Sequence, residues 1–185
     1  MAGAFTSVIQ NLGGVETDGI EVEATWLVSD SFLLGGNFAF FDAAASPGTI
    51  IIRGTDAMGN PILDDISGNR PNDAPEETAY LFGEYTFNLA GGSSLALRAD
   101  YQHRSDSWSN TANRDTRPYL QPKLNDVGAR VTWVSASGDT RVMLWGKNLR
   151  EDWDILTTGP GFLAFQFPQA AGGKTSYGVT ASFTF

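Results

Sequence analysis

The clearest indication of the fold is the stretch Tyr177-Gly178-Val179-Thr180-Ala181-Ser182-Phe183-Thr184-Phe185. Successive side chains of a β-strand point to opposite faces, so this stretch predicts a strand with one apolar face and one small, polar face. The apolar face holds Tyr177, Val179, Ala181, Phe183 and Phe185. Such a strand is typical of a transmembrane β-barrel, in which one face meets lipid and the other a polar interior. A terminal strand of a soluble β-sandwich can show the same alternation.

The composition fits a barrel and excludes several other classes. The 185 residues are 42% hydrophobic and 12% aromatic, and a mean hydropathy of -0.16 is too low for a helical membrane protein. No stretch approaches the ~18 apolar residues of a spanning helix. The net charge of -9 argues against nucleic acid as a partner, because proteins that bind the phosphate backbone carry a basic face. Without cysteine, a disulfide framework, a thiolate metal site and a cysteine nucleophile are excluded.

The same alternation recurs along the chain and predicts about eight strands of roughly ten residues. This is the length that a tilted strand needs to cross a bilayer. The expected strands cover residues 5–10, 19–28, 32–41, 79–89, 95–104, 124–134, 140–148 and 175–185. The predicted fold class is therefore all-β, an antiparallel transmembrane β-barrel region.

The connections between these strands alternate in length. Short turns are expected at Ser29, Gly91 and Ser137, and long segments cover residues 42–77, 105–119 and 150–174. All eight prolines fall in or beside the long segments, as expected if the spanning strands keep their backbone donors. Short periplasmic turns opposite long extracellular loops are the rule for outer-membrane barrels. In the alternative, a soluble sandwich or a lipocalin-like barrel, the long loops would not be confined to one end.

Three motifs stand in a characteristic order. A Gly-x-Glu-x-Glu pattern within Asp18–Trp26 follows Asn11-Leu12-Gly13, two prolines lie within Arg70–Thr78, and Val142–Leu149 ends in Asn-Leu. Together with Phe185, they resemble the carboxy-terminal barrel region of TonB-dependent outer-membrane receptors. The resemblance spans nearly the whole chain, so we assign residues 1–185 to this one region.

The resemblance implies a receptor in the cell outer membrane, and not an enzyme, that takes up a scarce ligand. Typical ligands are an iron-siderophore, a corrinoid or an oligosaccharide, and no cofactor is implied. The implied partners are outer-membrane lipid, the barrel-assembly machinery, and the TonB complex, which acts through an amino-terminal plug. The final strand would supply the barrel insertion signal, carried by Tyr177, Val179, Phe183 and Phe185.

Neither a plug nor a secretory signal is visible at the amino terminus. We therefore expect the chain to be the carboxy-terminal part of a longer receptor, unable to transport a ligand alone. The alternative is a self-contained eight-stranded outer-membrane barrel with a structural or adhesion role, since a barrel of that size has room only for packed side chains.

Charged side chains gather on the predicted inner face, among them Glu84, Arg98, Asp100 and Arg130. They either steer a ligand through the lumen or, as we favour, line and cross-link a wet lumen wall. In the hairpin around Gly91, Glu84 is expected opposite or diagonal to Arg98, forming a cross-strand ion pair worth little in water.

Aromatic side chains in exposed loops are common anchors of ligand recognition, and loops on a rigid scaffold often carry function. The candidates for ligand capture in the long segments are Trp108, Tyr119, Trp153 and Phe165.

Two other groups of residues carry weaker signals. His103 is the only histidine; alternation places it on the lipid side near the external interface, so no catalytic residue is predicted. The acidic clusters Asp64-Asp65 and Glu151-Asp152 with Asp154 follow no calcium-loop pattern. We interpret them as solvated loop carboxylates and predict no metal site.

Overall fold

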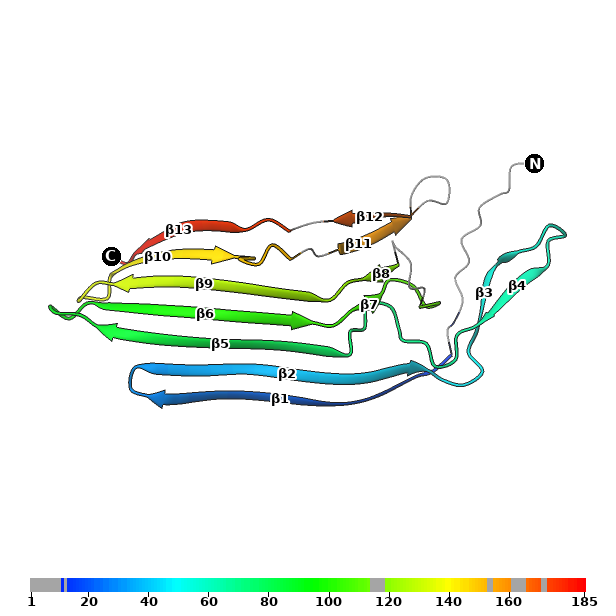
Figure 1. Cartoon of the computed structure of the whole chain (residues 1–185), viewed down its shortest axis with the longest axis horizontal. Helices are drawn as coiled ribbons and strands as arrows, with labels where there is room; N and C mark the ends of the chain where they lie inside the picture. Colours follow the sequence, from blue (N-terminus) through cyan, green and yellow to red (C-terminus); the bar gives the residue numbers. More distant parts are fainter. Residues whose placement is uncertain (1–10, 12, 114–118, 153–154, 161–165, 171–172) are drawn as a thin grey trace.

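The computed structural model describes residues 11, 13–113, 119–152, 155–160, 166–170 and 173–185, and the regular structure in these residues is all β. Seven long strands form one antiparallel sheet (Figure 1). In spatial order they are β1 (Val15–Ser29), β2 (Phe32–Ala45), β5 (Glu77–Asn88), β6 (Ser94–Arg104), β9 (Leu124–Val134), β10 (Thr140–Lys147) and β13 (Ser176–Phe183). The described residues contain no helix long and apolar enough to cross a membrane.

Seven of the strands expected from the alternation are present in this sheet. The expected strand at residues 5–10 lies outside the described residues. The first hairpin is longer than expected, because β1 begins at Val15 and β2 continues past Phe41 to Ala45. The pairing of Val15 with Ala45 carries this hairpin beyond the apolar part of its strands.

Short turns and long connections lie at opposite ends of the sheet, as expected. In Figure 1 the β1–β2, β5–β6 and β9–β10 turns lie on the left with the carboxy terminus, and the long connections leave on the right. The β5–β6 turn places Gly91 and Gly92 at φ values of 83° and 85°, a conformation that glycine adopts without steric cost. The sequence of this turn therefore allows a tight reversal of the chain.

Each long connection contains a small hairpin that the alternation did not predict. The pairs are β3 (Ile50–Thr55) with β4 (Pro61–Asp65), β7 (Ser107–Trp108) with β8 (Leu120–Gln121), and β11 (Ile155–Pro160) with β12 (Gln166–Ala170). The seven-stranded sheet contains no proline, whereas the hairpins contain Pro61, Pro160 and Pro168. Outside the bilayer, water can satisfy the backbone groups that proline leaves unpaired, so short edge strands tolerate it.

The sheet encloses no dry core. The buried apolar side chains in the described part of the chain are few and small, Ile66 being the largest. On the apolar face, Val179 is 68% exposed, Phe183 63% and Leu97 41%. A soluble protein rarely leaves so large an apolar surface uncovered. The soluble-sandwich alternative is therefore wrong, and lipid is the medium that fits this face.

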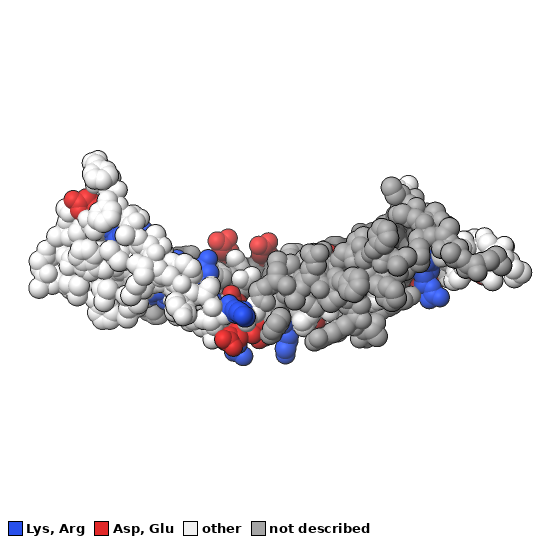
Figure 2. Space-filling view, turned by 90° about the horizontal axis from the view of Figure 1, so that it is seen from above, with Lys and Arg blue, Asp and Glu red and all other residues white. Residues whose placement is uncertain are grey.

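The sheet is open over the described residues, with β1 and β13 as its edge strands. Seen from the β13 edge in Figure 2, the described surface over the half that holds the short turns carries few charged side chains, and charges gather at mid-length. An uncharged band next to a charged region is the pattern that a membrane-spanning strand gives at a lipid interface.

Candidate functional site: the inner wall and the external loops

The register of the central strands fixes which side chains share the inner face. Glu84 on β5 pairs with Arg98 on β6, and Arg98 pairs with Arg130 on β9. The next row towards the long connections pairs Phe82 with Asp100. The four side chains expected in the lumen wall thus lie on one face of three adjacent strands.

The carboxylate of Glu84 is shared between two arginines. Its Oε2 lies 3.7 Å from Nη1 of Arg98 and 3.7 Å from Nη2 of Arg130. The cross-strand pair of Glu84 and Arg98 expected from the sequence is present, in the directly opposite register. Because the separations are long and the groups are partly exposed, the pairs contribute about 1 kcal/mol or less. One carboxylate against two guanidinium groups leaves this row with a net positive charge.

Arg98 is held in place by aromatic neighbours that the sequence reasoning missed. Its guanidinium carbon lies 3.6 Å from the centroid of the Phe82 ring, and its Nη2 donates a hydrogen bond to the Tyr80 hydroxyl over 3.0 Å. Tyr80 and Phe82 share the parity of Glu84 on β5, so the alternation that located Glu84 also locates them. The stacked and hydrogen-bonded Arg98 is a fixed cation of the wall.

Asp100 joins none of these ion pairs. Its carboxylate lies against Gly128 of β9, where an added Cβ would come within 2.5 Å of Oδ2. Within the described residues Asp100 has no hydrogen-bond or ion-pair partner. Its carboxylate is therefore free to accept hydrogen bonds from whatever occupies the inner side of the sheet.

A hollow of about 310 Å³ lies on the inner face nearer the short turns. Arg130 and Arg141 flank it, and its remaining polar lining is the Glu84 carboxylate and the hydroxyls of Thr132, Thr180 and Ser182. Arg141 forms no ion pair with any residue that the structure describes. Two guanidinium groups against one carboxylate leave the lining of this hollow with a net positive charge, which together with the hydroxyl donors suits anionic oxygens.

The outer face carries the residues expected to form the insertion signal. On β13, Tyr177 pairs with Gly146 and Val179 with Leu144 of β10, all on the apolar face. Phe183 lies on the same face and Phe185 follows the strand end; both are exposed. The arrangement presents a continuous apolar edge, and the role of this edge in insertion remains a prediction.

A shallow hollow of about 590 Å³ crosses this outer face. Its floor is a row of small residues, one from each of four adjacent strands: Gly83, Ala99, Ala129 and Gly146. Larger apolar side chains stand beside it, so the lipid-facing surface is uneven.

At the loop end, Trp108 is braced against a second long connection. The guanidinium of Arg70 lies 5.0 Å from the Trp108 ring centroid, and the Trp108 carbonyl accepts a hydrogen bond from the Asp73 amide over 2.8 Å. The side chain of Gln121 also donates to Asp73 over 2.6 Å. Nothing in the sequence spacing indicates this contact between segments 42–77 and 105–123.

The four ligand-capture candidates are only partly placed. Trp108 ends β7, and Tyr119 directly precedes β8, so both lie on one hairpin. The Tyr119 carbonyl accepts a hydrogen bond from the Ser109 amide over 2.8 Å. Trp153 and Phe165 lie outside the described residues. The structure therefore brings together two of the four aromatic candidates.

His103 faces outward, as the alternation predicted. It lies in the same outer row as Ala79 and Asn125, on the face opposite the charged inner wall. A hydrolytic site in the lumen would need this side chain to face inward.

Comparison with known proteins supports the same reading of the chain. The family model described as TonB dependent receptor-like, beta-barrel matches residues 2–149, most of the chain. No curated protein sequence matches significantly.

Two solved structures have a similar fold. The ferric yersiniabactin uptake receptor FyuA from Yersinia pestis gives a TM-score of 0.75 at 15% identity, covering 95% of this chain and 24% of that one. The siderophore receptor PiuA from Acinetobacter baumannii gives a TM-score of 0.68 at 15% identity, covering 91% of this chain and 22% of that one. The chain thus spans about a quarter of the length of either receptor.

The family match, the antiparallel sheet with one apolar face, and the confinement of the long connections to one end all agree. The resemblance seen in the sequence is confirmed: the chain belongs to the TonB-dependent receptor-like β-barrel family, a family of outer-membrane receptors and not of enzymes.

Proposed function

We propose that this chain forms part of the barrel wall of an outer-membrane receptor that imports a scarce ligand with energy from the TonB complex. The observation that carries the proposal is the two-faced sheet, apolar on one side and charged on the other, with braced hairpins at one end only. An apolar outer face suits lipid, a charged inner face suits a wet lumen, and ordered loops suit ligand capture.

An iron-siderophore is the ligand class that we favour over a corrinoid or an oligosaccharide. Two solved proteins of similar fold are described as an uptake receptor for ferric yersiniabactin and a siderophore receptor. The inner wall adds a chemical argument, because two arginines, Arg130 and Arg141, outnumber the one carboxylate, Glu84, in the lining of a hollow with hydroxyl donors. Guanidinium groups bind carboxylate-type oxygens through paired hydrogen bonds, so an anionic metal chelate complements this wall better than a neutral sugar does.

In this proposal the charged side chains of the inner face mainly connect neighbouring strands of the barrel wall. Glu84, Arg98 and Arg130 link three neighbouring strands, and the Phe82 and Tyr80 side chains hold Arg98 in place. Asp100 and Arg141, which have no ion-pair partner among the described residues, are available to contact a ligand or a plug. Contact with TonB would pass through a plug, and insertion would use the barrel-assembly machinery acting on the apolar final strand.

The receptor proposal differs from a self-contained eight-stranded barrel in what it expects of the sheet edges. The backbone groups on the free sides of β1 and β13 have no partner strand among the described residues. Each unsatisfied backbone group costs several kcal/mol in hydrocarbon. Pairing with further strands of a large barrel would satisfy both edges and leave a lumen wide enough for a plug.

The test is energy-dependent uptake by the complete receptor in cells that lack their own transporters for the probes. Accumulation of a radiolabelled ferric siderophore, a cobalamin and an oligosaccharide would be compared in cells with and without the TonB protein. We expect one probe class, the ferric siderophore, to accumulate only with TonB. Equal accumulation of every probe in both strains would overturn the proposal.

The wall and the loops can be tested in the same cells. Arg141→Gln is expected to weaken uptake, and Arg141→Lys to retain part of it because the charge remains. Two single variants, Trp108→Ala and Trp153→Ala, are each expected to weaken ligand binding at the cell surface. Unchanged uptake in both tryptophan variants would remove the support for aromatic capture in the loops.

A further inference from the structure

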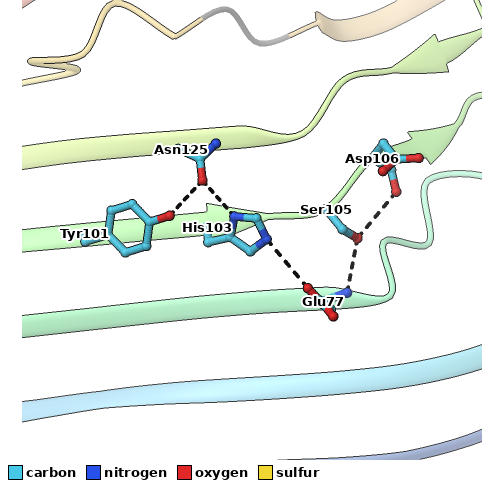
Figure 3. A network of polar contacts seen from close by, with 6 residues as sticks. All are labelled: Glu77, Tyr101, His103, Ser105, Asp106 and Asn125. Carbon is cyan, nitrogen blue, oxygen red and sulfur yellow. Dashed lines mark hydrogen bonds and ion pairs between the residues drawn. The ribbon is translucent and has the colours of Figure 1, made fainter.

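A polar cluster interrupts the apolar outer face at the loop end of the sheet. Glu77 of β5, His103 of β6 and Asn125 of β9 come from three adjacent strands, with Tyr101 one row below (Figure 3). The next outer row towards the short turns pairs Leu81 with Tyr101, and the outer rows beyond it are apolar. The cluster therefore marks the boundary between the apolar band and the external interface.

Hydrogen bonds fix the orientation of this cluster. The side-chain oxygen of Asn125 accepts from the Tyr101 hydroxyl over 2.7 Å and contacts Nδ1 of His103 at 2.8 Å. Because this oxygen is an acceptor only, Nδ1 carries the proton. The other ring nitrogen, Nε2, lies 3.9 Å from Oε2 of Glu77.

The groups left over define what the cluster can bind. The Asn125 amide nitrogen makes no hydrogen bond within the described part of the chain, so its two N–H donors are available. The Glu77 carboxylate is half exposed and the His103 side chain partly exposed. Donors from an amide therefore stand beside the acceptor oxygens of a carboxylate.

This combination favours hydroxyl groups over phosphate. A sugar hydroxyl can donate to the Glu77 carboxylate and accept from the Asn125 amide. A phosphate has acceptor oxygens and a negative charge, so the Glu77 carboxylate would repel it. The Asp152 carboxylate, which accepts from the Asn125 backbone amide over 2.8 Å, adds negative charge nearby.

We infer that Glu77, His103 and Asn125 form a binding site for the sugar headgroup of a glycolipid in the external leaflet. The site faces the membrane and lies opposite the inner wall, so it takes no part in ligand passage. Tyr101 is a positioning residue, because its hydroxyl fixes the Asn125 amide. The inference rests on the outer-membrane placement in the proposed function, but its readout is lipid retention and not uptake.

The test uses the complete receptor purified in detergent, with bound lipids counted by native mass spectrometry. The two probes are a dihexosyl diacylglycerol and a phosphatidic acid with the same acyl chains. We expect the receptor to retain the glycosyl lipid about tenfold better, the effect of one or two net hydrogen bonds. Equal retention of the two probes would overturn the inference.

Three variants locate the site. Asn125→Ala and Asn125→Asp both remove the amide donors, and the second keeps the oxygen that accepts from Tyr101 and His103. Each is expected to lower glycosyl lipid retention to the level of phosphatidic acid, whereas Asn37→Ala, at a similar height on the inner face, should leave it unchanged. The fold of Asn125→Asp is checked by its mobility on a gel run without heating. If this folded variant retains the glycosyl lipid as well as Asn37→Ala does, the inferred site around Asn125 is wrong.

Discussion

Replacing Leu97 with arginine tests the premise that the outer face meets hydrocarbon. Leu97 lies six residues from His103 on β6, about 20 Å along a strand. With a strand tilt near 45°, this is about 14 Å along the membrane normal. Since the apolar band of such barrels is about 25 Å tall, Leu97 lies near the bilayer midplane if His103 marks the external boundary.

At that depth Leu97→Arg is expected to lower the free energy of unfolding by about 2–4 kcal/mol. The loss corresponds to an unfolding equilibrium constant about 30-fold to 900-fold larger. The matched control is Ala96→Arg, one residue away on the inner face between Thr86 and Thr132. Its arginine would face water, so the change should stay within ~0.5 kcal/mol.

The assay is equilibrium unfolding of the complete receptor by urea in lipid vesicles, followed by tryptophan fluorescence. The Leu97 side chain is 41% exposed on this sheet, so an arginine there would cost little if the outer face met water. If Leu97→Arg and Ala96→Arg have the same free energy of unfolding, the outer face does not meet hydrocarbon and the reasoning fails.

Three further changes test other parts of the sheet. Glu84→Gln removes the carboxylate shared by Arg98 and Arg130 and should lower the free energy of unfolding by about 1 kcal/mol or less; a double-mutant cycle with Arg98→Met measures the coupling, and a value of several kcal/mol would contradict a solvated wall. Gly178→Val places a Cβ 2.6 Å from the Trp145 ring and should cost about 1–3 kcal/mol by overpacking, whereas Ser182→Val on the same face should cost far less; equal unfolding midpoints would contradict the close contact. Hydrogen bonds from Ser137 and Ser135 in the β9–β10 turn lower the pKa of Asp139. The ionised carboxylate therefore stabilises the fold above the unfolded-state pKa, and this stabilisation is lost as the pH falls through the folded-state pKa. Unfolding midpoints measured from neutral to acid pH should depend less on pH in Asp139→Asn, and an unchanged pH dependence would contradict the role of the turn.

The spanning strands were predictable because a strand that meets two media must alternate. Leu97 and Val179 fall on the outer face, and Glu84 and Arg98 on the inner face, as their parity in the sequence requires. A slip of one residue would move every side chain to the wrong medium. His103 lies six residues, an even number, from Leu97 on the same strand, so it must face outward as well.

The hairpins in the loops lie in water, where this constraint does not apply. A signal for β3 was present, since Ile50–Thr55 is rich in β-branched residues and is followed by a turn at Asp56, whose carboxylate accepts from the amides of Met58 and Asn60. The two-residue strands β7 and β8 carry no such signal. The contact of Arg70 with Trp108 joins segments far apart in the sequence, and single-sequence spacing cannot indicate it.

Strand direction also bears on how the sheet is completed. Seven strands that alternate in direction leave β1 and β13 pointing the same way, as their arrows show in Figure 1. Joining these two edges directly would require a parallel pair, whereas single-chain bacterial barrels close with an even number of antiparallel strands. The only additional strand expected from the sequence, residues 5–10, is shorter than the 9–11 residues that a tilted strand needs to span a bilayer. Closure into a small barrel would leave part of each edge unpaired in hydrocarbon, at several kcal/mol for each backbone group. Pairing with full-length strands of a larger barrel avoids this cost, so the direction of the edge strands favours the receptor over the self-contained barrel.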